Sequence, residues 1–383
     1  MKKSILHFLI IFSSLTACKT KTEAQKTDEY TESEKLEIAQ LALLTENFTY
    51  NVSFSEGKAT VMRNDSAGIV DLKGTVTMLP NLLTLQPFQQ GLAAASTRAN
   101  IACYVDLTGK IVHEFPNYES VDNFVEGDFS VFSHKNGNYG LIDKNFKEVI
   151  PAKYNQTRLW RGGIFIVETG GKWGAVDKDD KTVIPFEYES LDFLDDGGYI
   201  EAKKKTGKGF IDKTGKEVVP CTFYYLSPFN ENLAFYSDKE MGEKYGVINR
   251  KGETVLPPQP YIRVEPFSNG MAVVAKEVGG FGLSGYIDAM GKEIIAPQYL
   301  DATSFSPAGA AVVGDGTHVF MIDKKGQKLA APKLEDLTYE KMERFENGFV
   351  KLKLSNGEVV YIDRFGNPLS LSDIVEKRDA FFK

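Results

Sequence analysis

The chain has 383 residues, of which 42% are apolar, 25% charged and 12% aromatic, a balance typical of a folded globular protein and too apolar for a disordered one. Its 52 acidic and 45 basic residues give a net charge of −7, which argues against nucleic acid as the main partner. Three Cys and four His are too few for a zinc framework or a disulfide-dense secreted fold.

Residues 1–17 predict a signal peptide. Lys2 and Lys3 give it a positive start, and the apolar run from Ile5 to Leu15 is too short to span a bilayer core of roughly 30 Å. Small residues then lead to Cys18, an order that resembles the lipobox of bacterial lipoproteins. The resemblance implies that Cys18 is acylated and anchors the mature chain in the bacterial cell envelope. Lys19 implies the outer rather than the inner membrane, and an ordinary secretory signal with an incidental Cys is the alternative.

The next two segments lie between this leader and the main domain. Residues 18–32 contain almost no apolar group and predict a flexible tether, because such a chain cannot repay the entropy lost on ordering. Residues 33–47 predict a short helix, from the helical spacing of Leu36, Ala39 and Leu43 and a candidate N-cap at Ser33.

Residues 48–370 predict a domain of about nine repeats. In each repeat a hydrophobic pair precedes an acid or its amide, and successive copies are 34–40 residues apart. An aromatic residue stands 17–21 residues before each of them. The acidic series is Asp71, Asp106, Asp143, Asp177, Asp212, Asn249, Asp288, Asp323 and Asp363, and the aromatic series is Phe54, Phe88, Phe124, Trp160, Phe193, Phe229, Phe267, Phe305 and Phe345.

Each repeat predicts three strands. A Gly-containing turn follows the aromatic residue, and two strands then lead to the acid. The sequence Asp-x-x-Gly predicts a hairpin turn in which Asp bonds its own backbone, and a Pro such as Pro151 or Pro185 ends the third strand or marks a sheet edge. Phe146 and Asp180 replace the turn Gly in two copies, where we expect altered turns.

This pattern resembles the WG repeat of many bacterial lipoproteins and secreted proteins, with Trp173-Gly174 as the literal copy of the motif. The resemblance covers about Phe48 to Leu369, and departs from the pattern at Lys208 and Ser284, where the aromatic residue would stand. It implies a β-rich repeat scaffold used in binding and carries no catalytic signature.

Three strands cannot bury their apolar faces alone, so neighbouring repeats must stack. We therefore predict an all-β array of nine three-strand units with short terminal helices. An open superhelical solenoid is preferred over β-propeller-like closure, because the repeat spacing drifts and nine units exceed the usual four to eight blades. Residues 371–383 predict a C-terminal capping helix with apolar Ile374, Val375 and Phe381.

The sequence predicts no catalytic residue, no cofactor and no metal site. The acidic series is interpreted as turn caps rather than calcium ligands, because each loop offers one carboxylate beside a cation. His113, His134 and His318 are scattered along the chain. Cys103 and Cys221 are interpreted as buried free thiols, with a disulfide as the alternative.

Two clusters have the composition of a binding site. The basic run Lys203, Lys204, Lys205 and Lys208 is interpreted as a solvated turn, with an anion or lipid head group as the alternative. Arg158, Trp160 and Arg161 resemble an interface hot spot, although the position of Trp160 in the aromatic series favours core packing and leaves the two arginines as surface candidates.

Three functions fit these observations. The first is a lipid-anchored, non-catalytic scaffold that binds an envelope protein or a glycan. The second is an envelope enzyme acting on glycans, with residues such as His134, Glu168 or Tyr236 in a groove. The third is a structural cell-surface spacer, which predicts polar faces without apolar patches. A map of the exposed aromatic residues in each repeat separates these functions.

Overall fold

The computed structural model describes residues 30–43, 54–125, 128–193, 198–239, 244–331, 333–334, 336–344 and 349–382. The expected signal peptide, Cys18 and the tether up to residue 29 lie outside these residues. Phe345 and the side chain of Trp160 do so too.

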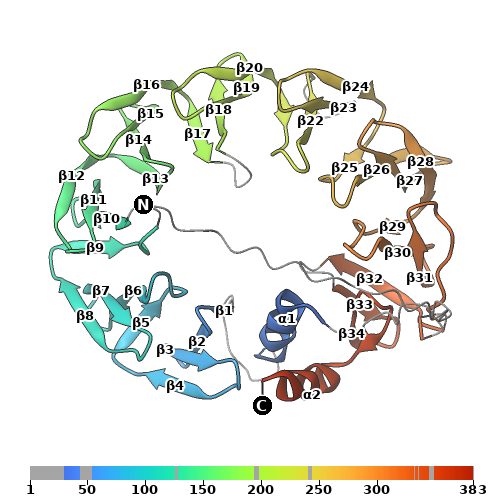
Figure 1. Ribbon diagram of the computed structural model, residues 1–383, viewed down its shortest axis with the longest axis horizontal. Coiled ribbons are helices and arrows are strands. Elements are labelled where there is room, and N and C mark those ends of the chain that lie inside the picture. Colours follow the sequence, from blue (N-terminus) through green and yellow to red (C-terminus); the bar gives the residue numbers. More distant parts are fainter. Residues whose placement is uncertain are drawn as a thin grey trace, which may run out of the picture.

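Nine antiparallel sheets follow one another along the described chain, and Figure 1 shows them arranged around a ring. The first three sheets contain β1 (Phe54–Ser55), β2 (Lys58–Arg63), β3 (Ser66–Asp71), β4 (Val76–Leu79); β5 (Leu82–Leu85), β6 (Leu92–Thr97), β7 (Ala102–Asp106), β8 (Ile111–Phe115); and β9 (Tyr118–Val121), β10 (Phe129–His134), β11 (Tyr139–Asp143), β12 (Glu148–Tyr154). The next three contain β13 (Gln156–Arg161), β14 (Ile164–Thr169), β15 (Lys172–Val176), β16 (Thr182–Tyr188); β17 (Ser190–Phe193), β18 (Ile200–Lys204), β19 (Gly207–Ile211), β20 (Glu217–Phe223); and β21 (Tyr225–Leu226), β22 (Leu233–Ser237), β23 (Tyr245–Asn249), β24 (Thr254–Gln259). The last three contain β25 (Arg263–Val264), β26 (Met271–Val278), β27 (Phe281–Asp288), β28 (Glu293–Tyr299); β29 (Asp301–Ala302), β30 (Ala310–Gly314), β31 (Val319–Asp323); and β32 (Tyr339–Arg344), β33 (Val350–Leu354), β34 (Val359–Ile362), β35 (Pro368–Leu369).

Eight of these sheets have four strands, one more than each repeat predicts. The additional strand is the first of its sheet and lies at or before the aromatic residue, as β5 lies before Phe88. In Figure 1 the first strand lies towards the centre of the ring and the last on its rim, as β17 and β20 show. The first strand escaped prediction because it is short, with only two residues in β21 and β25, and has no sustained apolar pattern.

The acidic series forms the same turn in all nine repeats. One side-chain oxygen of each Asp, or of Asn249, accepts hydrogen bonds of 2.8–3.1 Å from the backbone N–H groups two and four residues later. These bonds account for an acid or its amide at this position, because the side chain takes the place of a backbone acceptor.

The altered turns expected at Phe146 and Asp180 are wrong. Both residues adopt the positive φ of the usual Gly, at 61° and 63°. Their side chains contact other strands: Phe146 stacks on His113 with ring centroids 4.5 Å apart, and Asp180 accepts a 2.6 Å hydrogen bond from the Tyr154 hydroxyl. Such contacts offset the backbone strain, which is on the order of 1 kcal/mol for each residue.

The Gly of the aromatic-Gly pair lets the outermost strand approach the third strand. A Cβ atom on Gly140 or Gly174 would lie 2.5 or 2.8 Å from the carbonyl oxygen of Ile150 or Ile184. The register between the two strands shifts at the same place. Pro151 and Pro185 follow these carbonyls in the edge strand, where a missing N–H breaks no ladder.

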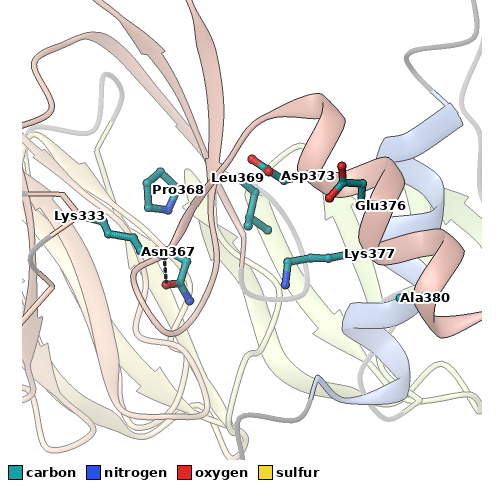
Figure 2. A pocket seen from close by; sticks show the side chains of 8 residues that line it. All are labelled: Lys333, Asn367, Pro368, Leu369, Asp373, Glu376, Lys377 and Ala380. Carbon is teal, nitrogen blue, oxygen red and sulfur yellow. Dashed lines mark hydrogen bonds between the residues drawn. The ribbon is translucent and has the colours of Figure 1, made fainter.

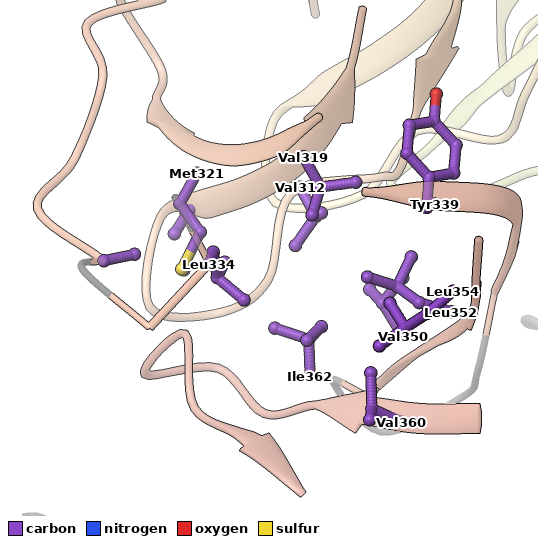
Figure 3. Close-up of a cluster of buried hydrophobic side chains, with 12 residues drawn as sticks. Val312, Val319, Met321, Leu334, Tyr339, Val350, Leu352, Leu354, Val360 and Ile362 are labelled. Carbon is purple, nitrogen blue, oxygen red and sulfur yellow. The ribbon is translucent and has the colours of Figure 1, made fainter. Parts of the chain in front are cut away.

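The hydrophobic core is divided among the interfaces between sheets. Eight clusters of buried residues each join two consecutive sheets, from the first to the ninth. Figure 3 shows the cluster in which Val312 and Met321 of one sheet pack with Leu352 and Ile362 of the next. Five aromatic-series residues are almost fully buried in these clusters, namely Phe88, Phe124, Phe229, Phe267 and Phe305. The sheets therefore stabilise one another, as expected for stacked repeats.

Two helices close the ring between its first and last sheets (Figure 1). They are α1 (Glu32–Leu43) and α2 (Leu371–Phe381), and they pack against each other. Ile38 and Leu41 of α1 share a buried cluster with Tyr361 of the last sheet and Ile374 of α2. On the other side, a Cβ atom on Gly74 of the first sheet would lie 3.1 Å from the guanidinium group of Arg378.

Of the two expected arrangements, the ring therefore follows the propeller-like closure and not the open spiral. The reason is that the terminal helices bury apolar surface against each other and against the last sheet, while Arg378 of α2 lies beside Gly74 of the first sheet. The helix expected over residues 33–47 spans Glu32–Leu43, and its N-cap is Thr31 rather than Ser33. Thr31 and Glu34 form a reciprocal capping pair, since each accepts a hydrogen bond from the backbone N–H of the other. At the other terminus, Ser370 and Asp373 cap α2 in the same way.

Candidate binding surface

The ring has two distinct faces. Because neighbouring strands alternate in direction, the turns that join first to second and third to fourth strands lie on one face, called here the turn face. It carries the Asp turns. The hairpins that join second to third strands, and the connections between sheets, lie on the opposite face, called here the hairpin face.

Exposed apolar residues are concentrated in one sector of the ring. Of ten large hydrophobic side chains exposed among the described residues, eight lie between residues 224 and 300, in the sixth and seventh sheets and at the start of the eighth. These are Tyr224, Tyr225, Ile262, Val278, Phe281, Met290, Ile294 and Leu300. Leu36 and Val112 are the other two. A concentration of this kind is typical of an interaction site.

Three of these residues share one position of the repeat. Tyr224, Ile262 and Leu300 each stand five residues before the aromatic-series residue and donate a backbone hydrogen bond to the second strand of their sheet. The two preceding repeats have Asn155 and Glu189 making the same backbone bond. Three consecutive repeats thus place apolar groups on the hairpin face where their predecessors place polar ones. The three are missing from the predicted site residues, although their common offset from the aromatic series is a signal in the sequence.

The hairpin of β26 and β27 extends this apolar region. Both strands have eight residues, whereas the second and third strands of the other sheets have four to six. Gly279 and Gly280 turn the chain with positive φ at both positions, the form that suits a two-residue hairpin. Pairing with β25 and β28 ends at Ala275 and Ser284, so the last pairs of the hairpin project beyond the sheet.

The two exposed residues at the hairpin tip face the sixth sheet. Side chains alternate along a strand, and Val274 and Ile287 pack towards that sheet, so Val278 and Phe281 project to the same side. Their exposed fractions are 44% and 62%. Ile262 lies on the other side, where a Cβ atom on Gly282 would be 3.0 Å from its Cδ1 atom.

Two tyrosines form the facing part of the sixth sheet. The rings of Tyr225 and Tyr245 meet edge to face with centroids 5.3 Å apart, and Tyr245 packs on the cluster that joins the sixth and seventh sheets. Burial is the main cause that raises the pKa of Tyr225, followed by the nearby Tyr245. We define the apolar surface as Tyr224, Tyr225, Ile262, Val278 and Phe281.

The charged groups beside the apolar surface have partners within their own sheet. Lys276 pairs with Glu293 at 2.6 Å and lies over the ring of Tyr261. Arg263 donates a 2.8 Å hydrogen bond to Ser284. With these cations engaged, contact through the apolar surface depends on burial of aliphatic and aromatic groups.

The basic run in the fifth sheet is matched by acidic residues. Lys204 lies 3.0 Å from both Glu187 and Glu217, and these carboxylates raise its pKa. Lys203 and Lys208 are paired with Glu189 and Glu201 at 3.6 and 2.7 Å. This neutralisation favours the solvated turn over an anion site.

The arginine candidates lie near the inner strands of the fourth and fifth sheets. Arg158 of β13 contacts Asp192 of β17 at 2.5 Å and lies over the ring of Trp173 at 4.5 Å. It therefore joins two neighbouring sheets. Arg161 is half-buried at the end of β13.

The residues considered for catalysis lie in three separate sheets. His134 ends β10, while Glu168 of β14 accepts a 2.5 Å hydrogen bond from the N–H of Gly171. Tyr236 of β22 packs against Phe223, with ring centroids 5.0 Å apart. His113 and His318 are elsewhere on the ring, and no group of three metal-ligating side chains occurs among the described residues.

Cys103 and Cys221 are buried free thiols in the second and fifth sheets, so the alternative of a disulfide between them is wrong. Burial raises the pKa of each thiol to about 11. These thiols are therefore protonated and unreactive at neutral pH.

A cavity of about 680 Å³ lies between α2 and the last sheet, away from the apolar surface (Figure 2). Its lining is Lys333, Asn367, Pro368, Leu369, Asp373, Glu376, Lys377 and Ala380. Asp373 already caps α2, and Asn367 already bonds Asp363 in its turn. Much of its polar lining therefore serves the fold.

The antiparallel sheets form a ring, and each sheet is built from consecutive strands of the chain. This arrangement is a repeat scaffold of the β-propeller type. The family model described as WG containing repeat matches residues 139–173, 173–208, 209–239, 245–277 and 285–314. Five WG-containing repeats thus lie within residues 139–314, where the sequence predicted such repeats. The first match runs from β11 into β15, so that each family repeat spans two sheets and links them.

Solved structures resemble the chain only weakly. A computationally designed protein, Ika8, is 15% identical with a TM-score of 0.35 and aligns over 73% of this chain and 95% of its own. A eukaryotic initiation factor is 13% identical with a TM-score of 0.48 and aligns over 73% of this chain and 86% of its own. BamB from Moraxella catarrhalis is 14% identical with a TM-score of 0.37 and aligns over 73% of this chain and 92% of its own. No curated protein matches the chain. In the described part of the chain, neither helix has the length and apolar character needed to cross a bilayer.

Proposed function

We propose that this protein is a non-catalytic scaffold of the bacterial outer membrane, anchored by acylated Cys18, whose apolar surface binds a partner protein. The observation that carries the proposal is the concentration of exposed apolar groups on two neighbouring sheets. A structural spacer has no need of such a surface, and an enzyme would need convergent polar groups.

A protein partner fits this surface better than a glycan does. Phe281, Val278 and Ile262 offer no hydrogen-bonding group, and the nearby Lys276 and Arg263 already have partners. Tyr224 and Phe281 are exposed by 54% and 62%, enough to fill pockets on another protein. Aromatic residues of this kind are enriched among the anchors of protein interfaces.

Photo-crosslinking in the native envelope tests the proposal. A photoreactive residue at Phe281 is expected to yield a discrete, protease-sensitive adduct. The matched control is the same residue at Val112, which is exposed by 47% on the outer strand of the second sheet. The proposal fails if position 281 gives no adduct, if both positions give the same products, or if the adduct is a glycan.

A further inference from the structure

We infer that the ring is held with its turn face towards the membrane, so that the hairpin face and its apolar surface are presented to a protein partner on the side away from the bilayer. This inference rests on the proposed anchor at Cys18 and on the place where the chain joins the ring.

Tyr30 is the first described residue, and it is fixed on the last sheet. Its hydroxyl donates a 2.5 Å hydrogen bond to Asp363, and its ring packs on Phe365 and Phe381 with centroids 5.7 and 5.5 Å away. Burial, with the Asp363 hydrogen bond next, raises the pKa of Tyr30. Only 8% of Tyr30 is exposed, so the chain has a defined position here.

The partners of Tyr30 belong to the turn face. Asp363 and Phe365 lie in the Asp turn between β34 and β35. A second contact secures the same place, because Glu34 of α1 lies 3.2 Å from Arg364 in that turn. The chain from Cys18 thus reaches the ring on the face opposite to the apolar surface.

The length of the connecting chain limits how the ring can lie. Eleven residues separate Cys18 from Tyr30, and a chain of that length extends to about 36–40 Å at most. A flexible chain of eleven residues spans roughly 17–20 Å on average. With the turn face towards the bilayer, this average span is sufficient.

The inverted orientation requires the connection to exceed its average span. The connection would first have to pass the depth of the ring, which for strands of five or six residues is about 17–20 Å before the turns are added. That depth takes up about half of the maximum reach and the whole of the average span, so the connecting chain would lose conformational entropy. The apolar surface therefore meets a protein partner rather than the anchoring membrane.

Two labels on opposite faces of one sheet test this orientation. Phe281→Cys places a thiol on the hairpin face and Met290→Cys places one in the Asp turn of the same sheet, and both positions are exposed. Cys103 and Cys221 are buried, so neither competes for the label. Each lipidated full-length variant carries an environment-sensitive fluorophore in phosphatidylethanolamine–phosphatidylglycerol vesicles that contain a lipid-bound quencher.

We expect a larger loss of fluorescence from the label at position 290 than from that at position 281. Equal losses, or a larger loss at 281, overturn the orientation while leaving the anchor intact. A Cys18→Ser version of each variant is the control and is expected to stay off the vesicles. If it binds as well as the parent, or if the parent does not bind, the proposed anchor fails instead.

Discussion

Asp180 and Phe146 occupy a backbone conformation that seven other repeats assign to Gly. Asp180 contacts Tyr154 and Phe146 contacts His113, each on another strand, so a tertiary contact offsets the local backbone strain. The sequence shows the exception to the Gly pattern, but the compensating contact depends on which strands become neighbours. For this reason the altered turns were predicted wrongly, whereas the nine turn positions themselves can be read from the chain.

The two buried thiols predict a loss of stability in alkaline solution. The folded protein holds the pKa of Cys103 and Cys221 at about 11, above the ordinary 9.0. The unfolded chain therefore releases these protons first, and the free energy of unfolding falls as the pH rises from 9 towards 11, by up to about 2 kcal/mol for each thiol.

Urea unfolding at several pH values measures this effect. The double variant Cys103→Ala/Cys221→Ala serves as the control, because it retains the buried tyrosines, whose unfolded-state pKa is near 10. In the double variant, the free energy of unfolding is expected to stay constant between pH 9 and 10 and to fall less steeply above pH 10 than in the parent protein. A decline of the same size in both proteins would contradict the assignment to the thiols.

At the scale of the element, the third strand of six of the nine sheets has Gly where the outer strand approaches. A Cβ atom on Gly209 would lie 2.5 Å from the carbonyl oxygen of Val219 and 2.6 Å from the N atom of Cys221. Because both are backbone atoms, Gly209→Ala is expected to lower the free energy of unfolding by about 1–3 kcal/mol. Gly57→Ala is the comparison, since nothing lies within 4 Å of the added atom and only the positive φ of 75° is unfavourable.

Thermal unfolding of the two variants decides between steric and conformational causes. A smaller loss, of about 1 kcal/mol, is expected for Gly57→Ala. If Gly57→Ala proved as destabilising as Gly209→Ala, the close approach of the outer strand would not be the reason for Gly in the motif.

The elements of the repeat differ in how visible they are in the sequence. The second and third strands have apolar runs and the Asp turn follows them, so the positions of these two strands and of the turn could be predicted. The first strand pairs along one edge only and is as short as Tyr225–Leu226, which leaves no periodic signal. The long β26–β27 hairpin did leave one, because the interval from Asn249 to Asp288 is 39 residues.

For the whole molecule, the closure of the ring could not be deduced from the repeats. Each repeat specifies its interface with the next, but the closing interface depends on helices outside the repeat pattern. Ile38 of α1 has no exposed surface and lies in the buried cluster that joins the two helices to the last sheet. Ile38→Ala is expected to cost about 2–5 kcal/mol at this interface.

Hydrogen exchange by mass spectrometry locates that loss. Amide exchange is expected to increase in β1–β4 and β32–β35 and to remain unchanged in the sheets across the ring, because each repeat contacts mainly its neighbours. Leu36→Ala on the exposed side of the same helix is the control. A uniform increase around the ring would show that closure and the remaining interfaces unfold as one cooperative unit.

Among the described residues, every sheet of this ring is built from one continuous stretch of chain, with no strand supplied by the opposite terminus. Duplication of a gene segment encoding 34–40 residues would therefore deliver one more strand quartet with its own binding loop. Only α1 and α2, which close the ring, would have to adapt to its larger size. Rings of different size, each displaying a different set of loops, are thus accessible by single recombination events.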